Sequence, residues 1–227
     1  MRAQGKTPRY LGAAFLGVVL TSLVSGVATD KALGTGGVTS ILQNVASNAD
    51  VMHFGILAGL ANAVGILILA SLLYAVLEGH GRTLAMVALL CWVGESLFYT
   101  LNQVASTGLL RLGTNFVNAG SPNGSFYQTL GGFLYNDVYK LGGVILMFFY
   151  CAGGLAWYYL FYKSRIVPRW LSVYGLAAVG LGLVGASVEL FGNSVGMVPF
   201  IALLPFELIT GFLLMLRGAS EPPASAG

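Results

Sequence analysis

Six long apolar stretches, separated by short polar segments, dominate the pattern of hydrophobic positions along the chain. The hydrocarbon core of a bilayer is about 30 Å thick, so a helix that crosses it needs roughly 20 predominantly apolar residues. The pattern predicts an all-α transmembrane bundle of six helices that forms one domain over residues 1–227. The expected spans cover residues 10–28, 52–77, 84–110, 138–162, 170–190 and 196–216.

Composition agrees with this pattern. Hydrophobic residues make up 56% of the 227 residues and charged residues only 8%, a balance that excludes an ordinary soluble domain. We expect a multi-pass protein of the cell membrane whose partners include membrane lipids and which binds no nucleic acid. Glycine-rich helix faces permit dimers without requiring them.

Positive charges are distributed unevenly between the connections. If the N-terminus is cytoplasmic, most Lys and Arg residues fall on the inner side, as is typical of cytoplasmic loops. Both termini are therefore expected in the cytoplasm. In the alternative, the first stretch is a signal peptide cleaved near Ala28, although it is longer than the apolar region of most such peptides. The expected inner set is Arg2, Lys6, Arg9, Arg82, Lys163, Arg165, Arg169 and Arg217, and the outer set is Lys31, Arg111 and Lys140.

Two connections on the expected outer side are long. The segment 29–50 contains a weakly amphipathic piece at 38–45 that suits the membrane surface. The segment 111–137 combines turn-forming residues at 120–124 with several aromatic residues. A connection of that length without regular structure is commonly a lid or a binding loop. We expect 111–137 to cover the outer mouth of the bundle.

Two acidic residues interrupt otherwise apolar spans. Glu95 lies in the third span and Glu207 in the sixth, both near mid-depth when positions are measured at about 1.5 Å per residue from the inner-end arginines. A charged side chain at the bilayer centre costs at least about 2.5 kcal/mol, and intramembrane acids commonly mark ion or substrate sites. Glu95 and Glu207 are therefore the leading candidates for ligand binding.

Other polar residues extend from these acids toward the expected outer side. Tyr99 and Asn102 follow Glu95 by four and seven residues, so they share its helix face. Because the inner half of the spans has almost no ionisable group, we expect a pocket that opens outward. The candidate set is completed by Asn62 in the second span and, nearer the outer surface, by Gln103 and His53.

Each acid also has a purely structural interpretation. A protonated Glu95 would donate a hydrogen bond to a neighbouring helix and hold the bundle together without a ligand. Pro205 removes a backbone donor two residues before Glu207, which predicts a kink that the acid would help to repair.

No cofactor or metal site is expected. His53 and His80 fall at opposite faces of the membrane, so they do not form a pair of haem ligands. Cys91 and Cys151 show no metal-ligand or disulfide spacing. No phosphate-binding loop or nucleophile elbow is present, so catalytic residues stay unassigned.

Small residues line one face of the fifth span. In lipid, small faces let helices approach closely, so we interpret this stripe as a packing surface. Its members are Gly175, Ala178, Gly182 and Ala186.

Several segments together resemble a family of bacterial six-span membrane proteins known as domain of unknown function 4386. The resemblance covers nearly the whole chain and implies that the first span is retained and that similar proteins also place an acid or polar group at Glu95 and Glu207. It implies no particular activity. The segments that carry it are Ser47-Asn48-Ala49-Asp50, Arg82-Thr83-Leu84-Ala85, Tyr162-Lys163-Ser164-Arg165-Ile166-Val167-Pro168-Arg169-Trp170-Leu171, Leu204-Pro205-Phe206-Glu207-Leu208 and Leu216-Arg217-Gly218.

The leading functional hypothesis is a protein that binds or transports a small ligand, cation or proton. Glu95 is the chief site and Glu207 its partner across the bundle, and the neighbouring polar residues orient the ligand. One alternative is a membrane-embedded enzyme that acts on a lipid or another apolar substrate, with one of the acids as general base and a tyrosine assisting. Another is a structural or sensor subunit whose acids hold helices together.

Overall fold

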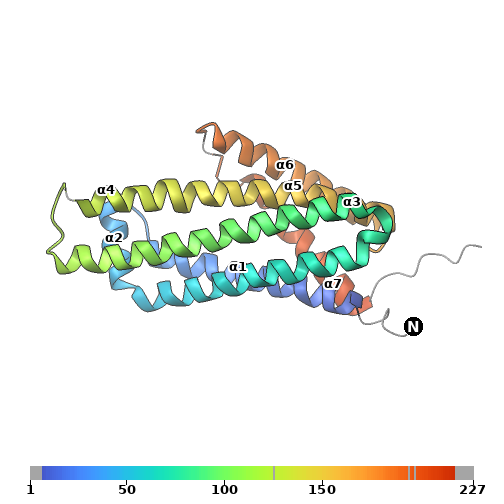
Figure 1. Ribbon diagram of the computed structural model, residues 1–227, viewed down its shortest axis with the longest axis horizontal. Coiled ribbons are helices and arrows are strands. Elements are labelled where there is room, and N and C mark those ends of the chain that lie inside the picture. Colours follow the sequence, from blue (N-terminus) through green and yellow to red (C-terminus); the bar gives the residue numbers. More distant parts are fainter. Residues whose placement is uncertain (1–6, 125, 194, 197, 218–227) are drawn as a thin grey trace, which may run out of the picture. The chain divides into compact units, whose positions relative to one another are not determined.

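The computed structural model describes residues 7–124, 126–193, 195–196 and 198–217, which form helices joined by short connections (Figure 1). No β-strand occurs in those ranges, which confirms the predicted all-α class. Arg2, Lys6 and Gly218, which the sequence analysis used, lie outside the described residues. In chain order the helices are α1 Thr7–Leu33, α2 Val38–Ser47, α3 Ala49–Asn118, α4 Phe126–Gly132, the π-helix η1 Phe133–Lys140, α5 Leu141–Ser164, α6 Arg169–Leu190, the 3₁₀ helix η2 Val198–Phe200 and α7 Leu203–Arg217.

Much of the apolar surface of these helices is not covered by protein. In four of the five segments long and apolar enough to cross a membrane, only 33–44% of the most apolar window is buried. Large side chains such as Leu57, Leu90 and Leu97 are exposed along α3. Soluble monomers rarely expose apolar surface on this scale, so the chain is a membrane protein. The five segments are Arg9–Leu33, Ala49–Asn118, Phe126–Ser164, Arg169–Leu190 and Val198–Leu216.

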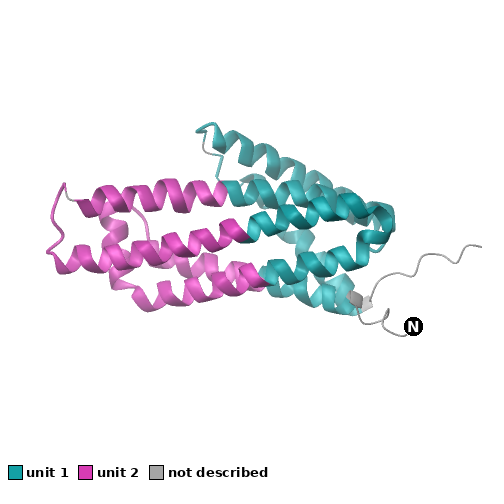
Figure 2. Cartoon of the chain, in the orientation of Figure 1, with its two compact units in different colours: residues 1–19, 65–96, 145–227 teal, residues 20–64, 97–144 magenta. Residues whose placement is uncertain are grey.

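Helix α3 contains the second and third expected spans. Its backbone is non-helical at Gly81 (φ 167°, ψ 79°), so α3 consists of two helices that meet there. The stretch Gly65–Ser96 doubles back at this glycine (Figure 2). Nζ of Lys163 donates a hydrogen bond of 2.6 Å to the carbonyl oxygen of His80. That contact satisfies an oxygen that the end of the first helix leaves without a helical partner. The five apolar segments therefore correspond to the six spans that hydropathy predicts.

The chain forms two compact units (Figure 2). This division does not test the prediction that residues 1–227 form a single domain, which stays a prediction. Unit 1 comprises Met1–Val19, Gly65–Ser96 and Ile145–Gly227, and unit 2 comprises Leu20–Val64 and Leu97–Val144.

In unit 2 the expected lid over 111–137 is wrong. Helix α3 continues to Asn118, and α4 begins at Phe126 and runs through η1 into α5 without a break. Of the stretch between these helices the structure describes 119–124, which form a connection at the cluster of turn-forming residues. The flanking apolar residues were predicted to form a loop, but they follow helical spacing and pack against a common core.

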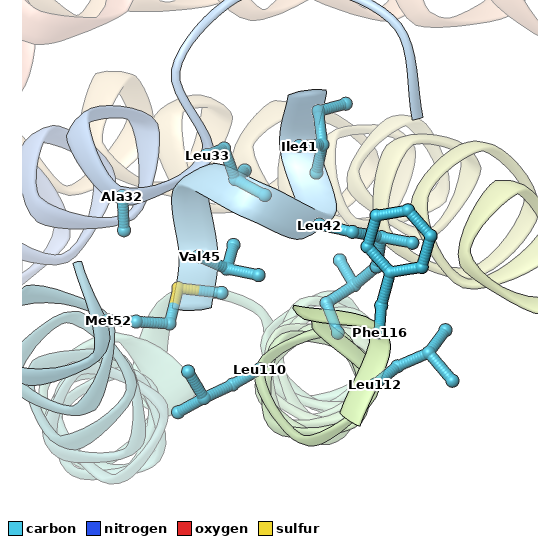
Figure 3. Packing of buried hydrophobic residues seen from close by; sticks show 10 residues of the cluster. Ala32, Leu33, Ile41, Leu42, Val45, Met52, Leu110, Leu112 and Phe116 are labelled. Atoms are coloured by element: carbon cyan, nitrogen blue, oxygen red, sulfur yellow. The ribbon is translucent and has the colours of Figure 1, made fainter. Parts of the chain in front are cut away.

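That core is a cluster of buried residues around the short helix α2 (Figure 3). Leu42 and Val45 of α2 are fully buried and contribute to the same cluster as Phe116 and Leu110 of α3. Three apolar residues on one side of α2 explain why the amphipathic piece at 38–45 is helical. The partly buried residues packed against the cluster include Tyr127, Leu130, Leu134 and Tyr135, all from the stretch expected to be a lid.

In unit 1 small residues of α6 lie where side chains of neighbouring helices need room. A Cβ added at Gly175 would clash with the ring of Phe206, and one added at Gly182 would come within 2.8 Å of Sγ of Cys151. Gly175, Ala178, Gly182 and Ala186 are all buried, as expected for a packing face.

The sixth expected span is interrupted before Glu207, where the 3₁₀ helix η2 and a turn at Ile201 and Ala202 precede α7. Helix α7 begins at Leu203, so Pro205 belongs to its first turn. A proline there costs the helix nothing, because the first backbone donors have no intrahelical acceptor in any case. The described contact of the Glu207 carboxyl is with the Tyr150 hydroxyl, and its role in repairing a kink stays a prediction.

Candidate functional site

Glu95 lies in the interior of unit 1. Its side chain is only 6% exposed, and its Oε2 atom is buried without a hydrogen-bond partner among the described residues. Trp92, one helical turn earlier, is equally buried. The helix face that carries Glu95 is therefore covered by protein, and the acid is not exposed to lipid.

Tyr150 of α5 is the neighbour that connects this face of α3 to α7. The rings of Trp92 and Tyr150 stack at a centroid distance of 5.8 Å and an interplanar angle of 8°. Nε1 of Trp92 also donates a hydrogen bond of 3.1 Å to the carbonyl oxygen of Tyr150. These two contacts fix the position of the tyrosine.

The hydroxyl of Tyr150 reaches the second acid. It donates a hydrogen bond of 2.8 Å to Oε1 of Glu207, whose side chain is partly buried on α7. The hydroxyl of Tyr158, two turns further along α5, lies 3.2 Å from the Tyr150 hydroxyl. Two hydroxyls and one carboxyl thus form a continuous hydrogen-bonded chain.

Apolar contacts hold the far end of this chain. The Phe206 ring lies 4.1 Å from the Tyr158 ring, centroid to centroid, at 44°. Gly175 of α6 leaves the space that Phe206 occupies. Because Phe206 immediately precedes Glu207, the packing of α6 on α7 determines the position of the Glu207 carboxyl.

The electrostatic surroundings of the two acids are unusual for buried carboxyls. Glu95 and Glu207 belong to the same unit as the Cys151 thiol and the Tyr158 hydroxyl. Among the described residues no Lys, Arg or His forms an ion pair with either acid. Two carboxylates without a counter-cation repel one another in a low-dielectric interior. Neutralisation of one of them by a proton or a bound cation removes that repulsion.

Four other side chains of unit 1 carry buried polar atoms without a hydrogen-bond partner in the described part of the chain. They are Nδ1 of His80, Nε1 of Trp157, Oγ of Ser172 and Oγ1 of Thr210. Thr210 lies one turn after Glu207 on α7. Polar atoms of this kind are usually satisfied in native proteins, often by water or a ligand.

Five of the seven residues expected to bind a ligand belong to unit 2. Asn62 is 1% exposed, and its Oδ1 accepts a hydrogen bond of 2.8 Å from the Thr21 hydroxyl. Nε2 of Gln103 donates a hydrogen bond of 3.2 Å to the backbone oxygen of Tyr99, whereas Oε1 of Gln103 has no partner among the described residues. The same is true of Oδ1 of Asn102.

His53 is exposed on the first half of α3, where it lines a separate cavity together with Arg111. The structure therefore brings Glu95 and Glu207 into one unit and gathers the remaining candidates in the other. It does not place His53 with the Glu95 carboxyl in a described contact.

Tyr150 and Tyr158 are the site residues that the sequence analysis missed. One signal for Tyr150 was present, because it lies about as many residues from the inner end of its span as Glu95 does from its own. Equal distance at a fixed rise per residue means equal depth. Nothing in the sequence indicated that its hydroxyl points toward α7.

Comparison with known proteins gives one match. The family model described as Domain of unknown function (DUF4386) matches residues 10–218. No curated protein and no solved structure matches the chain.

Proposed function

We propose a function for this chain from the premise that it belongs to the family Domain of unknown function (DUF4386). We infer that it is a multi-pass protein of the cell membrane, with both termini in the cytoplasm, that binds a proton or a small cation at Glu95 and Glu207. The observation that carries the proposal is the buried carboxyl of Glu95, whose Oε2 has no hydrogen-bond partner among the described residues, in the same unit as the Tyr150–Glu207 hydrogen bond.

Charge balance supports this proposal. An ion buried without a partner loses several kcal/mol of solvation even after the protein relaxes. The Tyr150 hydroxyl compensates Glu207 in part, because it donates to Oε1. Glu95 has no such donor at Oε2. Glu95 is thus the acid that gains most from a proton or a cation, and Glu207 is its charged or hydrogen-bonded partner.

The tyrosine chain supports a role for proton movement. Tyr158, Tyr150 and Glu207 are linked by contacts of 3.2 and 2.8 Å, both short enough for hydroxyl hydrogen bonds. A proton that leaves Glu207 can be replaced from the Tyr150 hydroxyl, and that of Tyr150 from the Tyr158 hydroxyl, provided that a water molecule or another donor then restores the proton of Tyr158. Asn62, Tyr99, Asn102 and Gln103, which belong to unit 2, are proposed to bind the same class of ligand.

A flux measurement tests the transport part of this function. The purified chain is reconstituted in liposomes that contain a pH-sensitive dye, and the decay of an imposed pH gradient is followed with and without Na⁺ or K⁺. We expect decay faster than in protein-free liposomes, and a return to that background in Glu95→Gln. Glu78→Gln, which removes an exposed carboxyl, is the matched control and should behave as wild type. Equal decay in the wild type, Glu95→Gln and protein-free liposomes overturns transport.

The Tyr150–Glu207 contact also favours a second candidate, a membrane-embedded enzyme. General base catalysis requires a second group within hydrogen-bond reach of the acid, and Tyr150 meets that condition. Incubation of the reconstituted protein with membrane lipids followed by mass spectrometry tests it. Lipid products formed by wild type and lost in both Glu207→Gln and Tyr150→Phe would favour the enzyme over the binding protein.

A further inference from the structure

A cavity lies in unit 2, and neither Glu95 nor Glu207 is among its lining residues. It has a volume of about 420 Å³, is open to the surface, and lies between the first turns of α3 and the last turns of the helix that follows the break at Gly81. This volume falls within the range of small-molecule sites, roughly 300–1,000 Å³. The lining residues are Ala49, His53, Leu110, Arg111, Thr114 and Asn115.

Arg111 and His53 give the cavity its chemistry. Both side chains are exposed, and neither makes a hydrogen bond, ion pair or ring contact with any described residue. The guanidinium of Arg111 stays charged and presents a planar fork of donors that matches phosphate or carboxylate. His53 supplies a further N–H donor. No acidic residue lines the cavity, and Asp50, three residues before His53, is not among the lining residues.

The other lining residues add further hydrogen-bond donors, which also favour an anion. Ala49 is the first residue of α3, and the cap residue Asn48 makes no side-chain hydrogen bond to the helix end. The first backbone N–H groups of a helix carry partial positive charge and lack helical acceptors. Asn115 contributes a side-chain amide. The Thr114 hydroxyl donates a hydrogen bond of 3.0 Å to the Leu110 carbonyl oxygen. Thr114 therefore lines the cavity but does not donate a hydrogen bond into it.

We propose that this cavity binds a phosphate group, with Arg111 as the bidentate donor and His53 as the second donor. Arg111 falls at the outer end of its predicted span, so the phosphate can belong to the head group of an anionic phospholipid or to a soluble phosphate compound. The shared chemistry is a tetrahedral oxyanion held by a guanidinium fork and an imidazole.

Two probes separate the sources. The full chain in an uncharged detergent is titrated with inorganic phosphate at constant ionic strength in a calorimeter. The same protein in nanodiscs of phosphatidylcholine, with or without phosphatidylglycerol, is examined by native mass spectrometry for retained lipid. Phosphate binding indicates a soluble ligand, and selective retention of phosphatidylglycerol indicates a lipid.

Variants decide whether the cavity is responsible. Arg111→Gln should weaken binding of the responding probe by about tenfold or more, the effect of losing a charged bidentate contact. The affinity of Arg111→Lys should lie between those of wild type and Arg111→Gln, because lysine keeps the charge and loses the planar fork of donors. His53→Gln is an independent second variant. Lys31→Gln removes one positive charge elsewhere in unit 2 and is the matched control.

The proposal is overturned if wild type retains neither probe, or if Arg111→Gln binds as wild type does. It is also overturned if Lys31→Gln weakens binding as much as Arg111→Gln, because that result shows a general charge effect. Gel filtration and helical content of each variant confirm that it is folded. Loss of transport in Glu95→Gln would leave these outcomes unchanged.

Discussion

The Tyr150 hydroxyl on α5 donates a hydrogen bond of 2.8 Å to Oε1 of Glu207 on α7. In the same tyrosine, the ring stacks on Trp92 and the backbone oxygen accepts the Trp92 indole N–H. One residue therefore ties together α3, α5 and α7 of unit 1. Because Trp92 lies one turn from Glu95 on α3, Tyr150 joins the surroundings of both acids.

Removing the Tyr150 hydroxyl should weaken this junction without dismantling it. Tyr150→Phe keeps the ring stack and loses the hydrogen bond, so we expect a loss of about 1 kcal/mol in unfolding free energy, with about 2 kcal/mol as the upper range for membrane proteins. Reversible unfolding in mixed detergent micelles measures it. Tyr159→Phe, half exposed on the same helix, is the control and should change stability little. Equal effects of the two substitutions would contradict the role of the hydroxyl.

The packing of α6 on α7 gives a second prediction. Gly175→Ala places a methyl group against the Phe206 ring, and overpacking of this kind costs about 1–3 kcal/mol. Gly180→Ala, on the same helix with nothing within 4 Å of its Cβ, should be neutral or stabilising. Thermal unfolding of the two variants in the same detergent provides the comparison. A Gly175→Ala protein as stable as Gly180→Ala would show that the close contact does not exist.

A third prediction concerns the buried cluster around α2 in unit 2, against which the helices of the stretch 111–137 pack. Leu42 is fully buried, so Leu42→Ala should cost about 2–5 kcal/mol. Gln43→Ala, exposed on the same short helix, should cost little. Limited proteolysis of the segment between α3 and α4 should accelerate in the first variant only. A mobile lid over 111–137 would instead be cleaved readily in the wild type.

The expected membrane orientation is tested by cysteine labelling. In a background that lacks Cys91 and Cys151, Asn123→Cys should react with a membrane-impermeant thiol reagent in intact cells. Ser164→Cys should react only after the cells are permeabilised, because its connection carries the inner-side charges. The reverse pattern would place both termini outside.

Hydropathy predicted the number and order of the spans because a span requires only a contiguous apolar stretch of sufficient length, which can be read directly from the sequence. It also located the break between the second and third spans, where Gly81 ends one helix and begins the next. The stretch 111–137 was predicted wrongly because its turn-forming residues cluster at 120–124 only, and their signal was extended over flanking residues that pack on α2.

The site was predicted in part for a different reason. Glu95 and Glu207 stand out in sequence because a charge is costly at bilayer depth. The contact of Tyr150 with Glu207 depends on how α5 and α7 are rotated about their axes, which neither composition nor spacing determines. The position of Pro205 in the first turn of α7 was not predicted for a related reason, since spacing from an acid does not say where a helix begins.

Infrared spectroscopy of the carboxyl groups tests the proposed binding of a proton or cation at Glu95 and Glu207 most directly. The reconstituted protein is measured near neutral pH in a buffer whose only cation is a bulky organic ion, and Na⁺ or K⁺ is then added. We predict a carbonyl band from a protonated carboxyl that disappears in Glu95→Gln, persists in Glu78→Gln and weakens on addition of an alkali ion if that ion is the ligand. A spectrum in which every carboxyl is ionised in the organic-cation buffer, identical in wild type and Glu95→Gln apart from the lost carboxylate, would contradict the proposal.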